Sequence, residues 1–243
     1  MVDHERPSLS VFLVTRSDYE AVRKTISFLE VQTALDRLEL ILVVPSVETL
    51  QPDEEDLAAF RWLQVVEVGP FESSGIAFAA AVRAARAPWV MYGEEHSYPA
   101  PNWAEVLIEA QQGPWGVVGC AMTNENPGTL SSWAHLIAQF GPVVEPVESG
   151  EAGYVAGHHS SYRRDPLLEF GDDLSGLLDA EIALHHALAD RGEKFYLASE
   201  AVSSHVNVSR FGAFVKLEFV GQRLFGAMRA RSLDWSWARR LLY

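Results

Sequence analysis

Four short apolar runs, separated by segments with helical spacing, limit the folds open to this chain more than any other feature. The runs are rich in Val, Leu and aromatic residues, as is typical of strands buried on both faces. They are Leu9–Thr15, Leu38–Val44, Leu63–Val68 and Trp89–Tyr92, and the helical segments between them are Tyr19–Thr33, Asp53–Phe60 and Ile76–Ala87. Strands that alternate with helices predict an α/β fold, with a mostly parallel, Rossmann-like sheet flanked by helices.

The second half of the chain continues this alternation less regularly. Helices are predicted at Trp103–Gln112, Trp133–Phe140 and Leu178–Arg191, and strands at Trp115–Ala121 and Phe195–Leu197. No linker is long enough to separate two domains, so we expect one domain followed by a helical extension over residues 209–243.

Composition excludes several classes of protein. Of the 243 residues, 48% are hydrophobic and 21% are charged, which excludes a disordered tail, a collagen-like fibre and a disulfide scaffold. The net charge of −14 repels nucleic-acid backbones, so we expect no nucleic-acid partner. Cys120 is the only cysteine, the first residues do not resemble a signal peptide, and no apolar run approaches the roughly 18 residues of a membrane span. We therefore expect a cytoplasmic protein.

The extension differs from the acidic body in charge. Residues 210–243 hold seven basic and two acidic side chains together with seven aromatic ones. Such a segment either lies on the anionic inner face of the cell membrane or packs its aromatic side chains against the body. Its abrupt end at Tyr243 suggests a longer native protein.

Two polar clusters follow predicted strands, at Thr15–Asp18 and Gly93–His96. Ligands of open α/β sheets bind beyond the carboxyl ends of the strands. Adjacent acids and an imidazole at Glu94, Glu95 and His96 suit Mn²⁺ or Mg²⁺ that also binds phosphate oxygens, although a solvated turn has the same composition.

Several phrases occur in a characteristic order along the chain. They are Leu9–Arg16, Leu29–Thr33, Val90–Trp103, Gly157–Arg164, Asp179–Glu181 and His205–Asn207. In order and spacing they resemble the family 2 glycosyltransferases of GT-A fold, the nucleotide-diphospho-sugar transferases, over about residues 8–208. The resemblance implies a GT-A domain over residues 8–208.

The resemblance also implies roles for single residues. The nucleotide contacts would be Thr15, Arg16, Ser46, Ser74, Gly75 and Glu94, and the metal contacts would be Glu94, His96 and His205. Glu181 would be the general base, and the acceptor contacts would be Trp133, Gly157, His158, His159 and Arg163. Ser74 and Gly75 begin a helix whose N–H groups suit a diphosphate, or an ordinary N-cap. Trp103 and Trp115 are expected in the core.

The implied function is transfer of a sugar from a nucleotide-sugar donor to a hydroxyl of a glycan or lipid-linked acceptor, with inversion, as in polysaccharide biosynthesis. Two departures favour an alternative. Val44-Pro45-Ser46 offers no acid where the family has aspartates, and Glu94-Glu95-His96 replaces three aspartates. The alternative is a non-catalytic GT-A-like module that binds a nucleotide, a glycan or a protein partner. A zinc site at Glu181 and His185, four residues apart, competes with a solvated helix face.

Overall fold

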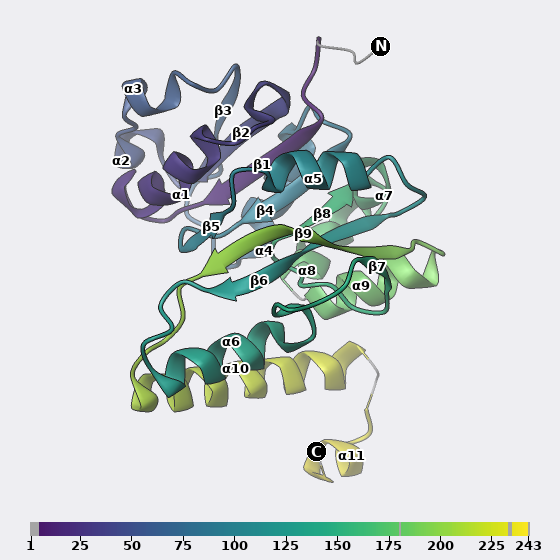
Figure 1. Ribbon diagram of the computed structural model, residues 1–243. Helices are drawn as coiled ribbons and strands as arrows, with labels where there is room; N and C mark the ends of the chain where they lie inside the picture. The colour runs from purple at the N-terminus through teal and green to yellow at the C-terminus, as the bar shows by residue number, and fades with distance from the viewer. Residues whose placement is uncertain (1–4, 180, 233–234, 243) are drawn as a thin grey trace.

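A single sheet organises the chain in the computed structural model, which describes residues 5–179, 181–232 and 235–242 (Figure 1). Within these residues the sheet has nine strands, and eight of them follow the order β3-β2-β1-β4-β8-β6-β9-β5, while β7 pairs with β9. The strands are β1 (Leu9–Val14), β2 (Leu38–Val44), β3 (Trp62–Glu67), β4 (Trp89–Gly93), β5 (Ser97–Pro99), β6 (Val117–Asn124), β7 (Gly150–Ala152), β8 (Ser160–Arg163) and β9 (Phe195–His205).

Strand direction decides where a site can form. Parallel pairs join β3 to β2, β2 to β1, β1 to β4 and β6 to β9. Strand β8 is antiparallel to both β4 and β6, so β6 and β9 run in the same direction as β1 to β4. The carboxyl ends of β1, β4, β6 and β9 therefore meet at one edge of the sheet, together with the start of β8. The mostly parallel sheet expected from the sequence is confirmed.

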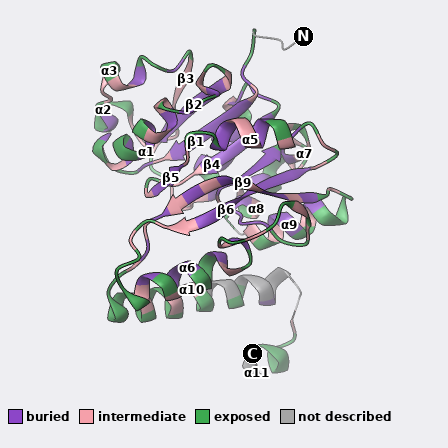
Figure 2. Cartoon of the chain, in the orientation of Figure 1, coloured by how far each residue is buried: buried purple, intermediate pink, exposed green. Residues whose placement is uncertain are grey.

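Helices cover both faces of this sheet. They are α1 (Glu20–Glu30), α2 (Val47–Leu50), α3 (Glu54–Leu57), α4 (Ser74–Ala84), α5 (Trp103–Ala110), α6 (Leu130–Phe140), α7 (Arg164–Leu168), α8 (Leu174–Leu178), α9 (Glu181–Asp190), α10 (Phe211–Ser232) and α11 (Trp237–Leu242). One buried cluster joins the sheet to α1, α5 and α6, and a second joins it to α4 and α7 to α9. Every residue of β2 is buried (Figure 2), and each fully buried Leu, Ile or Val contributes about 1.5–3 kcal/mol.

Of the two tryptophans expected in the core, Trp103 is buried there and Trp115 is half-buried against it. Trp103 is 3% exposed, and Trp115 stacks on Tyr196 with ring centroids 4.8 Å apart.

Strand β9 is longer than the sequence indicated. The prediction ended at Leu197, whereas the strand continues to His205 by pairing with β6 and β5. Its last part alternates buried and half-buried residues, with Ala201, Ser203 and His205 facing inward. The sequence did not predict this part of the strand, because several of its residues are small and polar, whereas strand propensity favours β-branched and aromatic residues. The added length carries His205 to the site edge.

The extension is helical, as expected, and α10 packs on α6 rather than on the sheet (Figure 1). The ring centroids of Phe214 and His135 are 6.3 Å apart, and the side-chain amide of Gln139 donates to the carboxylate of Glu218 at 3.3 Å. The outer side of α10 is exposed (Figure 2). Among the described residues, no helix is both long and apolar enough to cross a membrane.

Candidate functional site

The carboxylate of Glu94, directly after β4, is the centre of a histidine cluster. Its Oε2 lies 2.9 Å from His159 Nε2, 3.2 Å from His205 Nε2 and 4.0 Å from His96 Nε2, and its Oε1 lies 3.9 Å from His158 Nε2. Burial raises the pKa of the Glu94 carboxyl, but the surrounding imidazoles have the larger, opposite effect and bring the pKa well below its ordinary value. Glu94 is therefore ionised at neutral pH.

Three of these side chains form a possible cation site. Glu94, His96 and His205 each offer one ligand atom, and these atoms lie within 4.8 Å of one another. One carboxylate and two imidazoles are a donor set that first-row divalent cations accept. The three residues named from the resemblance are thus brought together.

Asn207 fixes the orientation of His205. The Oδ1 of Asn207 lies 2.9 Å from His205 Nδ1, and its Nδ2 donates to Asn124 Oδ1 at 3.0 Å. An amide oxygen only accepts, so His205 Nδ1 donates to it, and Nε2 faces Glu94 with either a lone pair or a proton. A lone pair and a carboxylate oxygen 3.2 Å apart repel each other unless a proton or a cation lies between them. A cation between the two atoms is one arrangement that fits this geometry. No role for Asn207 was predicted from the sequence.

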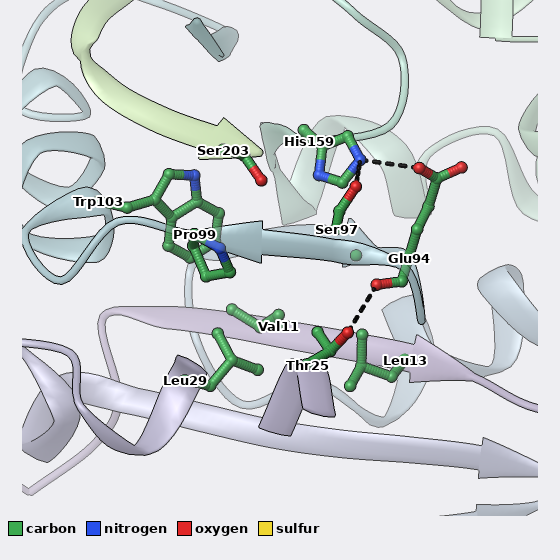
Figure 3. A pocket seen from close by; sticks show the side chains of 11 residues that line it. Val11, Leu13, Thr25, Leu29, Glu94, Ser97, Pro99, Trp103, His159 and Ser203 are labelled. Atoms are coloured by element: carbon green, nitrogen blue, oxygen red, sulfur yellow. Dashed lines mark hydrogen bonds and ion pairs between the residues drawn. The ribbon is translucent and has the colours of Figure 1, made fainter. Parts of the chain in front are cut away.

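His159 is more deeply buried than expected for a residue that contacts an acceptor. It is 3% exposed, and its Nε2 lies 3.1 Å from Ser97 Oγ as well as close to Glu94 (Figure 3). Burial lowers the pKa of His159 and also that of His96, against the opposing effect of Glu94. The prediction of acceptor contact is therefore corrected for His159, which supports Glu94 instead.

Glu181, at the start of α9, joins the cluster through His158. His158 Nδ1 donates to Glu181 Oε1. Burial lowers the pKa of His158, but the carboxylates of Glu181 and Glu94 raise it to about 9. Burial raises the pKa of Glu181, whereas His158 lowers it below the ordinary value. The His158 imidazole therefore outweighs burial and keeps the Glu181 carboxyl ionised at neutral pH.

The predicted nucleotide contacts at the strand ends lie at the expected edge. Thr15 is buried after β1, and its Oγ1 accepts from the backbone N–H of Ser17 at 3.1 Å. Arg16 is exposed and places its guanidinium 4.6 Å from the ring centroid of Phe71. Ser46 is half-buried after β2 and makes no side-chain cap to α2.

The start of α4 is already occupied. The N–H of Gly75 donates to Asp179 Oδ1 at 2.7 Å, and a Cβ at Gly75 would collide with the carbonyl of Ser175. The prediction that Gly75 and Ser74 offer backbone N–H groups to a diphosphate is therefore wrong for Gly75, which serves the close packing of α4 on α8. Ser74 is half-buried, one residue before it.

Two predicted acceptor residues are not among the side chains that contact Glu94. Arg163 pairs with Trp89 at the beginning of β4, so it lies at the opposite edge of the sheet from Glu94, a position that argues against acceptor contact. Trp133 lies on the exposed side of α6, where its indole N–H donates to the carbonyl of Pro127 at 3.1 Å. The zinc alternative is also weakened, because His185 Nε2 lies 2.8 Å from Tyr162 Oη.

Glu94 lines one side of a small cavity (Figure 3). It has a volume of about 20 Å³ and is lined by Thr25, Ser97, His159 and Ser203, among others. That volume holds roughly one water molecule. A cavity of this size is too small for a nucleotide.

Solved structures with the same architecture are glycosyltransferases. The chain matches S. aureus TarS with a TM-score of 0.60 and 17% identity over 82% of this chain and 36% of that chain. It matches TarS 1–349 in complex with UDP with the same TM-score and identity, over 81% of this chain and 60% of the other. GalNAc-T7 with UDP, GalNAc and Mn²⁺ matches with a TM-score of 0.60 and 16% identity, over 84% of this chain and 44% of the other.

These likenesses establish the fold. Both neighbours have the GT-A fold, so the GT-A fold expected from the sequence is confirmed. No family model matches the chain, and no curated protein matches it by sequence. The chain spans less than two thirds of the length of these neighbours.

Proposed function

We propose that this protein is an inverting glycosyltransferase, similar to family 2, that moves a sugar from a nucleotide-diphosphate donor to a hydroxyl of a glycan or lipid-linked acceptor. The observation that carries the proposal is the position of Glu94, His96 and His205 at the carboxyl edge of a GT-A sheet, with the Glu181 carboxylate one imidazole away. The neighbours bound to UDP support a nucleotide-sugar donor.

The chemistry assigns one role to Glu181. The acceptor hydroxyl oxygen attacks the anomeric carbon, its proton passes to the Glu181 carboxylate, and the bond from that carbon to the diphosphate oxygen breaks. The electron pair leaves with the nucleoside diphosphate, and a single displacement inverts the anomeric configuration. A carboxylate held ionised is ready to accept the proton, and general bases contribute about 10²–10⁴-fold.

Glu94, His96 and His205 would hold Mn²⁺ or Mg²⁺. The cation would supply positive charge opposite the departing diphosphate. Two imidazoles favour Mn²⁺, because Mg²⁺ prefers oxygen ligands. On the chain itself, Asn207 keeps His205 oriented and Thr15 and Arg16 would hold the nucleotide.

The alternative is a GT-A module that binds a nucleotide, a glycan or a partner without turnover. It is favoured by the end of β2, where Pro45 and Ser46 offer no carboxylate to a ribose. The two functions differ in whether nucleotide binding depends on a cation, since transfer requires a neutralised leaving group.

Calorimetry of the chain with UDP, GDP and dTDP, each with and without Mn²⁺, separates these functions. Metal-dependent binding of one nucleotide is expected and selects the donor class. No binding to any of them by folded protein would favour the module.

Substitution of the base provides the second test. Glu181→Gln should leave nucleotide binding unchanged and lower turnover by about 10²–10⁴-fold. Ile182→Gln, at an exposed neighbour in α9, is the matched control. Unchanged turnover in Glu181→Gln would exclude the base role.

We also propose that α10 contacts the anionic inner face of the cell membrane, where lipid-linked acceptors would be presented. Phe211, Phe219 and Val220 are 72%, 62% and 56% exposed, and Lys216 and Arg223 are exposed among them. Apolar and basic side chains on one exposed helix are typical of interfacial helices.

Sedimentation with vesicles tests this contact. Binding to vesicles with anionic lipid is expected, together with loss of binding in Lys216→Glu/Arg223→Glu and little binding to neutral vesicles. Equal binding of both proteins to both vesicles would refute the contact.

A further inference from the structure

We infer that His158 is a positioning residue for Glu181, which rests on the proposed function. The sequence suggested that His158 contacts the acceptor. The geometry gives it another task, because both ring nitrogens face carboxylates of the site.

The two contacts of the ring come from opposite sides. Nδ1 donates to Oε1 of Glu181, and Nε2 lies 3.9 Å from Oε1 of Glu94. The imidazole therefore lies between the proposed base and a proposed cation ligand. Without it, two carboxylates would face each other with no positive or donor group between them.

Aromatic neighbours hold the ring in this place. His158 meets Tyr92 edge-on with centroids 4.6 Å apart, and Phe78 edge-on at 6.0 Å. Tyr92 is 1% exposed and Phe78 is 7% exposed, and both belong to the same buried cluster. The imidazole is consequently fixed by packing and does not depend on Glu181 for its orientation.

Gly157 lets Glu181 approach. A Cβ at Gly157 would collide with the carboxylate and the Cβ of Glu181. The carbonyl of Gly157 accepts from Tyr162 Oη at 2.8 Å, which anchors the turn before β8. The turn therefore offers Glu181 a flat backbone surface beside the His158 donor.

These contacts define which oxygen of Glu181 is free. Oε1 is engaged by His158, whereas Oε2 faces Gly157 and has no donor among the described residues, so we assign the acceptor proton to Oε2. His158 acts through Glu181 by fixing the carboxylate plane. Loss of this contact should reduce catalysis while leaving donor binding intact.

Two replacements of His158 separate positioning from packing. His158→Phe keeps an aromatic ring against Tyr92 but has no donor, whereas His158→Asn places an amide N–H near the position of Nδ1. His186→Asn, at an exposed histidine of the same helix as Glu181, is the matched control. Turnover is measured as release of nucleoside diphosphate from the donor class selected by calorimetry.

We expect His158→Phe to lower kcat about 10²-fold, with the donor KM within about twofold of wild type. His158→Asn should recover at least about tenfold of that loss, and His186→Asn should match wild type. The double variant His158→Phe/Glu181→Gln should be no slower than Glu181→Gln alone, within about threefold, because one residue acts through the other. Full activity of His158→Phe, or additive losses in the double variant, would overturn the inference.

A second readout keeps the two proposals apart. The Nδ1 proton of His158 should give a hydrogen-bonded NMR signal in wild type that is lost in Glu181→Ala. If wild type turns over no donor, the proposed transferase function fails, and this signal still tests the contact. Its absence in wild type, or its persistence in Glu181→Ala, would refute the contact itself.

Discussion

His185 should make folding stability depend on pH in a calculable way. The side chain is 7% exposed, its Nε2 lies 2.8 Å from Tyr162 Oη, and Glu181 and His186 are the charged or titratable groups that act on it. Burial lowers the pKa of His185 from 6.5 to about 4; Glu181 opposes this shift and His186 reinforces it. The folded state therefore resists protonation that the unfolded state accepts.

The sign follows from linkage. A base whose folded pKa is lowered contributes stability that is complete above pH 6.5 and is lost as pH falls from 6.5 toward 4. A difference of about 2.5 in pKa is worth up to about 3 kcal/mol, and about 2 kcal/mol has been lost at pH 5.

Urea unfolding between pH 8 and pH 5, in a chelator that removes cations, measures this loss. His185→Gln keeps an amide near Tyr162 and does not titrate, so its stability relative to wild type should rise by about 2 kcal/mol as pH falls from 8 to 5. His186→Gln, at the exposed neighbour, should retain most of the wild-type pH dependence, because His186 makes the smallest of the named contributions to the shift. A constant difference between wild type and His185→Gln at every pH would refute the reasoning.

Three further predictions concern single contacts. Asn207→Ala releases His205 and should weaken Mn²⁺ binding about 10–100-fold by calorimetry, with the melting temperature checked in parallel. Gly75→Ala places a Cβ against the carbonyl of Ser175 and should cost about 1–3 kcal/mol in urea unfolding. Glu39 is fully buried and accepts a hydrogen bond from Ser10 at 2.5 Å. Glu39→Ala should lower the free energy of unfolding by about 1–3 kcal/mol, because buried donors lose their partner. An unchanged urea midpoint in Gly75→Ala or in Glu39→Ala would contradict the prediction for that variant.

The sheet was largely predictable because its central strands are buried on both faces. Strand β2 is apolar at six of its seven positions, and its bounds coincide with the prediction. The end of β9 was not predictable, because its residues 199–205 contain Ser, Glu and His, and only pairing with β6 and β5 makes them a strand. Local composition therefore identified the buried central strands of the sheet but not the polar end of β9.

The site was predictable where one strand end supplies neighbouring residues and unpredictable where two elements meet. Glu94 and His96 lie in one turn after β4, so the sequence placed them together. His158 and Glu181 are 23 residues apart, and their contact depends on how α9 packs, on Gly157 having no side chain and on the direction of β8. The same antiparallel direction of β8 carries His158 to the site edge and sends Arg163 to the opposite one. A motif that spans an antiparallel strand thus divides its residues between two edges of the sheet. In this chain, only the residues that precede β8 lie at the edge that holds Glu94.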